Sequence, residues 1–208
     1  MAALFALALA GCAGVARDET PAAVYDFGQT AGAESAEFRA DALAGRLALE
    51  VGAAPWLDGR GIDYRLAYGD PLRRGQYADS RWAAPPAQLL AQQLRRQIGF
   101  AAADSVAAAC VLRVELQEFS HVFTLPSTSQ GVLQGQISLI DAKRRLIAGR
   151  AVGIERPARE SDAAGGVQAL VETSAELGRQ IAGWLDRLEQ EGRLKGCAPD
   201  GRGQKGNR

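Results

Sequence analysis

Apolar and polar residues alternate along several stretches of this 208-residue chain, which is the pattern of β-strands with one buried face. The strongest alternation runs from Cys110 to Leu125, and we expect that strand to bend near Ser120 and His121. Two similar stretches follow, Leu133–Leu139 and Leu146–Ile154, and turn-forming residues separate all three. We therefore expect these strands to form an antiparallel meander.

Shorter stretches nearer the N-terminus predict further strands. They are Tyr25–Gly28, Leu47–Val51, Ile62–Tyr68 and Gln76–Trp82. In the third of these, Tyr64 and Tyr68 share a face with Ile62 and Leu66. This shared face favours packing of both tyrosines against the sheet over a role in an interface.

A period of three to four residues marks two helices. Pro85 and Pro86 suit the first turn of a helix that Gly99 ends, and a longer amphipathic helix runs from about Asp162 to Gln190. Four or more strands with two one-sided helices predict an α/β fold of the α+β type. It would be one mixed or antiparallel sheet of about five to seven strands, covered by two main helices.

The N-terminus has the pattern of an export signal. Residues 2–9 are uninterruptedly apolar, and the segment Leu9–Cys12 resembles the lipobox of bacterial lipoproteins, although no basic residue precedes Arg17. The alternative is an apolar N-terminus that contains a cysteine by chance. On the lipoprotein interpretation Cys12 is lipidated and becomes the first residue, and Ala13 after it resembles an outer-membrane sorting signal.

These patterns divide the chain into four parts. They are a signal peptide (1–11), a lipidated tether (12–23), one periplasmic domain (24–191) and a disordered basic tail (192–208). The tail carries five basic residues against Asp200, so we expect it to be solvated or to touch an anionic membrane surface. The whole chain has a formal net charge of zero, which gives no electrostatic support for nucleic-acid binding.

Two cysteines remain after Cys12. Cys110 alternates in register with buried positions and Cys197 lies in the predicted tail, so they either form one disulfide or stay unpaired thiols. A metal site is not expected, since the chain has no C-x-x-C motif and a single histidine.

No motif predicts an enzyme or a cofactor. The chain lacks a G-x-S-x-G elbow, an H-E-x-x-H motif, a P-loop and a dinucleotide glycine pattern. The only histidine, His121, lies on a strand beside Phe119 and Phe123, where a packed or surface histidine is more common than a catalytic base.

Arginines and aromatic residues interleave between residues 73 and 82. Protein interfaces are enriched in both types, because they offer large contact area and directional hydrogen bonds. The sequence therefore suggests a partner-binding surface, against the alternative that these side chains pack or solvate the sheet. The candidate residues are Arg73, Arg74, Tyr77, Arg81 and Trp82.

Two segments resemble a known family. The segments WLDGRGIDYR (56–65) and QYADSRWAAPPAQLL (76–90), placed after a lipobox, resemble the ABC-type transport auxiliary lipoproteins of MCE lipid-transport systems. The resemblance implies a non-enzymatic subunit, lipid-anchored at the outer membrane and facing the periplasm. Its partners would be an MCE-domain protein and, through it, an inner-membrane permease and ATPase; homo-oligomerisation is left open. The alternative is a lipoprotein chaperone or assembly factor for another envelope complex.

Overall fold

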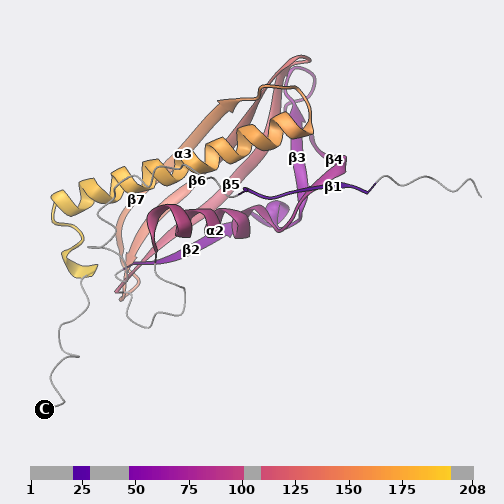
Figure 1. Cartoon of the computed structure of the whole chain (residues 1–208). Helices are drawn as coiled ribbons and strands as arrows, with labels where there is room; N and C mark the ends of the chain where they lie inside the picture. Colours follow the sequence, from indigo (N-terminus) through magenta and orange to yellow (C-terminus); the bar gives the residue numbers. More distant parts are fainter. Residues whose placement is uncertain (1–20, 29–46, 101–108, 198–208) are drawn as a thin grey trace, which may run out of the picture.

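The computed structural model describes residues 21–28, 47–100 and 109–197 (Figure 1). The strands are β1 (Ala23–Tyr25), β2 (Leu47–Ala53), β3 (Gly61–Leu66), β4 (Arg74–Trp82), β5 (Cys110–Leu125), β6 (Thr128–Asp141) and β7 (Leu146–Pro157). The helices are α2 (Pro86–Ile98) and α3 (Ala163–Gln190), with short 3-10 turns η1 (Pro55–Leu57) and η2 (Lys195–Cys197).

The seven strands form one mixed sheet in the order β1-β4-β3-β5-β6-β7, and β2 pairs with β5 beside β3. β5, β6 and β7 are antiparallel neighbours, whereas β2 and β3 each run parallel to β5. The predicted α+β fold with a single mixed sheet and a C-terminal meander is therefore confirmed.

Both helices lie on the same face of the sheet and contact each other (Figure 1). Pro86 occupies the first turn of α2, and Gly99 ends the helix in the left-handed conformation at φ 75°. Asp162 caps α3, where its side chain accepts a hydrogen bond from the backbone N–H of Gly165 at 2.8 Å. The predicted ends of both helices are confirmed.

A bulge divides β5 into two halves. Even-numbered residues face the core in the first half, and Phe119, an odd-numbered residue, faces it after the bulge. The pairing of β5 with β6 shifts between Leu116 and Glu118, earlier than the predicted bend near Ser120. Before the shift Leu112 and Leu116 point into the core, and after it Phe119 does so. Gly135 lies opposite the bulge, and a Cβ there would clash with the backbone of Glu115.

An aromatic cluster fills the core beneath the end of β4. The ring of Trp82 lies 5.5 Å from that of Phe27 and 5.7 Å from that of Phe119. Trp82 is only 1% exposed, so its assignment to a partner-binding surface is wrong. The physical reason is its position at the last residue of β4, where the strand passes over the core before α2 begins.

The C-terminal residues through Cys197 pack on the domain. Leu194 and Cys197 are buried, and the guanidinium of Arg193 donates a hydrogen bond to the carbonyl of Ile147. The prediction of a disordered tail from residue 192 is therefore wrong for its first six residues, whereas residues 198–208 lie outside the described part of the chain.

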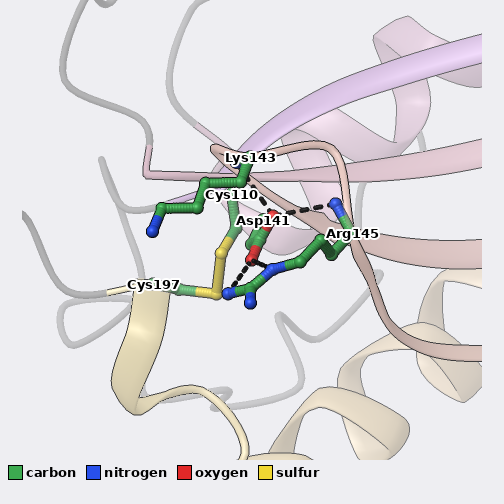
Figure 2. Close-up of a disulfide and its surroundings, with 5 residues drawn as sticks. All are labelled: Cys110, Asp141, Lys143, Arg145 and Cys197. Atoms are coloured by element: carbon green, nitrogen blue, oxygen red, sulfur yellow. Dashed lines mark hydrogen bonds and ion pairs between the residues drawn. A yellow bond between two sulfur atoms is a disulfide. The ribbon is translucent and has the colours of Figure 1, made fainter.

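A disulfide joins Cys197 to Cys110 at the start of β5 (Figure 2). Cys110 pairs across the sheet with Asp141, whose carboxylate accepts hydrogen bonds from the backbone N–H groups of Lys143 and Arg145. Backbone and side-chain hydrogen bonds from Arg145 lower the pKa of Asp141. The disulfide therefore attaches the chain after α3 to a braced turn at this end of the sheet.

A tyrosine–histidine pair lies where the sheet meets α3. His121 is fully buried, and its Nδ1 shares a hydrogen bond of 2.8 Å with the Tyr77 hydroxyl. A Cβ at Gly166 would clash with the imidazole, so the glycine lets α3 approach the ring. Burial lowers the pKa of His121 to about 4, against the opposing effect of Asp162, and burial raises that of Tyr77 to about 12.

The disulfide closes a loop with a sequence separation of 87 residues. We expect Cys197→Ser to lower the free energy of unfolding by about 2–4 kcal/mol, because the bond restricts the unfolded chain. Urea denaturation measures this loss, and a thiol assay on the denatured, unreduced protein tests the bond itself. Two reactive thiols in that assay, beyond Cys12, would show that the bond does not form.

Stability should fall on acidification because His121 is held neutral. Its folded pKa of about 4 lies below the usual 6.5, so the unfolded chain binds more protons between these values. The free energy of unfolding should be constant above pH 6.5 with respect to this group and drop by up to about 3 kcal/mol as the pH falls to 4. Urea denaturation across that range should show a shallower decline for His121→Gln, even if the variant is less stable at every pH. Equal pH slopes for the two proteins would contradict the assignment.

Candidate interaction surface

Two connections meet at one end of the sheet, and we call residues 66–73 and 124–128 the sheet tip. The first connects β3 to β4, and the second connects β5 to β6. Leu66 pairs with Phe123 across the parallel β3–β5 ladder, and the N–H of Ala67 donates to the carbonyl of Phe123 at 2.9 Å. This pairing brings the two connections side by side, at the opposite end of β5 from the disulfide.

An ion-pair network lies at the base of the tip. Glu118 accepts from the guanidinium groups of Arg65 at 2.9 Å and Arg74 at 3.0 Å, and Arg74 also pairs with the buried carboxylate of Asp63. Gln76 donates a further hydrogen bond to Asp63 at 2.9 Å. Each arginine therefore has a carboxylate partner within the domain, and Asp63 tolerates burial because two side chains donate to it.

The same network holds the β3–β4 connection in place. The second nitrogen of the Arg65 guanidinium donates to the carbonyls of Pro71 and Leu72, at 3.4 Å and 3.3 Å. Within the connection, the Asp70 carboxylate accepts from the N–H of Leu72 at 3.1 Å. The loop is thus held by the Arg65 side chain and by its own Asp70, and these bonds fix the backbone of Leu72.

Apolar side chains are exposed across the tip. Leu72 is 88% exposed, Leu125 58%, Tyr68 48% and Leu66 38%. The expectation that Tyr68 packs against the sheet is therefore wrong. β3 ends at Leu66, so the alternation that placed Tyr68 inward stops before it reaches this residue.

A groove of about 460 Å³ lies beside two of these side chains, Leu66 and Tyr68. It is lined by Tyr64, Leu66, Tyr68, Gly69, Asp70, Arg73, Arg74 and Gly75. Tyr64 packs over Gly75, where a Cβ would clash with the tyrosine ring, and its ring lies 5.0 Å from that of Tyr77. Tyr64 thus belongs partly to the fold, as expected, and partly to the wall of the groove.

The structure separates the residues that the sequence grouped as one binding surface. Arg73 and Arg81 are exposed, whereas Arg74 belongs to the ion-pair network and the hydroxyl of Tyr77 is bonded to His121. Cys12 lies outside the described residues. Sequence analysis missed Leu72 and Leu125, although a leucine between Pro71 and Arg73 in a polar turn is a detectable signal.

The chemistry of the described residues gives no metal site: no group of three or more His, Cys, Asp and Glu side chains within them is arranged to hold an ion. Among the described helices, none has the length and apolar character needed to span a membrane. His121 is enclosed between Tyr77, Phe123 and Gly166, so its ring is not open to a substrate.

Solved structures share this fold. A Xanthomonas campestris protein of the DUF330 family is 19% identical with a TM-score of 0.61, over 70% of this chain and 85% of that one. An uncharacterized protein is 18% identical with a TM-score of 0.60, over 79% of this chain and 99% of that one. No curated protein matches the chain.

The sequence also matches a family model over residues 33–182, which is more than half of the chain and includes both segments noted above. The model describes an auxiliary transport component rather than an enzyme. The chain therefore belongs to the family of ABC-type transport auxiliary lipoprotein components.

Proposed function

We propose that this protein is a lipid-anchored periplasmic subunit of an MCE-type intermembrane lipid-transport system, and that it docks the transport conduit at the outer membrane. The observation that carries the proposal is the family match over residues 33–182, combined with the lipobox-like segment Leu9–Cys12 upstream of it. Energy for transport would come from the cytoplasmic ATPase, through the inner-membrane permease and the MCE-domain protein.

The position of β1 suits an anchor at Cys12. β1 begins at Ala23 and lies at the edge of the sheet against β4 (Figure 1). The eleven residues from Ala13 to Ala23 reach roughly 35–40 Å when extended. A tether of that length keeps the domain close to the membrane that holds the lipid.

The docking part of the proposal now depends on fewer residues. Of the five predicted partner-binding residues, Arg81 is the exposed one that lies on a strand, next to β1 at the sheet edge. Its partner in the β1–β4 ladder is Val24, which is 54% exposed. An exposed arginine beside an exposed apolar side chain at a sheet edge is the kind of surface that binds another protein.

The anchor is tested by changing Cys12. We expect Cys12→Ser to move the protein from the membrane fraction to the soluble periplasmic fraction and to remove the added lipid mass from the intact protein. Cys197→Ser is the matched control and should remain in the membrane. Ala13→Asp should shift the protein to the inner membrane on a density gradient. A Cys12→Ser protein that remains membrane-bound with an unchanged mass would contradict the anchor.

The docking surface is tested by reversing one charge at a time. We expect Arg81→Glu to reduce co-purification of the MCE-domain protein by about tenfold, because a charge reversal at an interface adds repulsion to the lost contact. Lys143→Glu, on the turn at the disulfide end, is the matched control and should capture it normally. Equal capture by both folded variants would reject Arg81 as part of the surface. Capture of a different envelope complex in place of the MCE-domain protein would favour an assembly factor.

A further inference from the structure

We propose that the sheet tip is a second membrane contact: Leu72 and Leu125 insert at the headgroup level of the phospholipid bilayer that holds the lipid anchor. The inference rests on the anchoring part of the proposed function. It adds to that function the surface of the domain that faces lipid.

Four apolar side chains are exposed at this end of the sheet. Leu66, Tyr68, Leu72 and Leu125 come from two neighbouring connections, and the pairing of Leu66 with Phe123 holds those connections together. Single exposed leucines are ordinary on protein surfaces, whereas several exposed apolar side chains gathered at one end of a sheet indicate a candidate binding site. The core of the domain does not need these side chains: Leu66 and Leu125 are the last residues of β3 and β5, and Tyr68 and Leu72 lie in the connection after β3.

Hydrogen bonds to its backbone hold Leu72 in an exposed position. Arg65 donates to the backbone carbonyl of Leu72, Asp70 accepts from its backbone N–H, and Glu118 fixes Arg65 from below. A loop without such bonds would be free to fold its leucine against the protein. Here the ordering cost is met during folding of the domain, so insertion of Leu72 requires no further ordering of the loop.

Charge distinguishes a phospholipid surface from a highly charged partner. Around the tip and its base, three arginines face three carboxylates: Arg65, Arg73 and Arg74 against Asp63, Asp70 and Glu118. This near balance gives no field that would collect a polyanion. Zwitterionic headgroups suit such a surface, with the Arg73 guanidinium beside lipid phosphates and the Tyr68 ring at the interface, where tyrosine is enriched in membrane proteins.

The tether is long enough to let the tip reach the bilayer. Ala23 pairs with Ser80, and β4 begins six residues earlier at Arg74, so the tip lies roughly 20 Å along the strand from the point where β1 starts. The extended tether reaches roughly 35–40 Å. Anchor and tip therefore can contact one membrane at the same time, and the anchor raises the effective concentration of lipid at the tip.

Depth-dependent fluorescence tests the contact in the lipidated, full-length protein. Leu72→Trp and Leu146→Trp each replace an exposed leucine with one added tryptophan, at opposite ends of the sheet. Leu146 is 66% exposed and is the matched control. In phosphatidylcholine vesicles with brominated acyl chains, the signal added at position 72 should lose at least half its intensity relative to unbrominated vesicles. The signal added at position 146 should change little. Equal quenching at the two positions would overturn the proposal.

A second measurement removes the anchor. In the full chain carrying Cys12→Ser, adding Leu72→Asp should lower partition onto phosphatidylcholine vesicles about tenfold, whereas adding Leu146→Asp should not. Because the contact is apolar and the tip has no net charge for salt to screen, vesicle binding should change little between about 50 and 300 mM salt. Matching urea denaturation curves establish that both variants fold.

Other outcomes identify a different occupant. Normal vesicle partition together with lost capture of the MCE-domain protein by Leu72→Asp would make the tip a protein-docking surface and overturn the proposal. The failure of the proposed function is a separate result, because it appears as a Cys12→Ser protein that remains lipid-modified or as absent MCE capture by the unmodified protein.

Discussion

The bulged strand β5 is the constraint on which the rest of the structure depends. Its 16 residues pair with β6 along one edge and with two different parallel strands along the other, β2 in the first half and β3 in the second. Without the bulge, the regular alternation of the strand would turn Glu118 rather than Phe119 into the core. The shift after Leu116 corrects this, so Leu112, Leu116 and Phe119 all reach the core while Glu118 stays available to the arginines on the other face.

Because β5 is roughly 50 Å long, it separates the molecule into two ends with different chemistry. At its start the Cys110–Cys197 disulfide and the Asp141 turn join the end of the chain to the sheet. At its finish the ion-pair network supports a loop with an exposed leucine. One end is closed by covalent and hydrogen bonds, and the other carries apolar surface that folding does not use. The two ends of the sheet therefore offer surfaces of different kinds.

The arginines at the end of β3 and the start of β4 have a structural role that their sequence pattern does not indicate. Arg65 and Arg74 are neutralised by Asp63 and Glu118, residues that lie far from them in sequence or on another strand. The main role of these arginines is therefore to hold the β3–β4 loop in one conformation, in which Leu72 is exposed to solvent.

The sequence by itself determined the element types, the ends of both helices and the meander, because these depend on local periodicity and on caps such as Pro86, Gly99 and Asp162. It also identified the family. It did not determine which of the interleaved arginines and aromatics reach solvent: Trp82 is enclosed by Phe27 and Phe119, and Arg74 by Asp63 and Glu118. The partner of Cys110, the position of the bulge and the exposure of Leu72 were likewise decided by tertiary structure. Each depends on contacts between residues distant in the chain, which periodicity cannot encode.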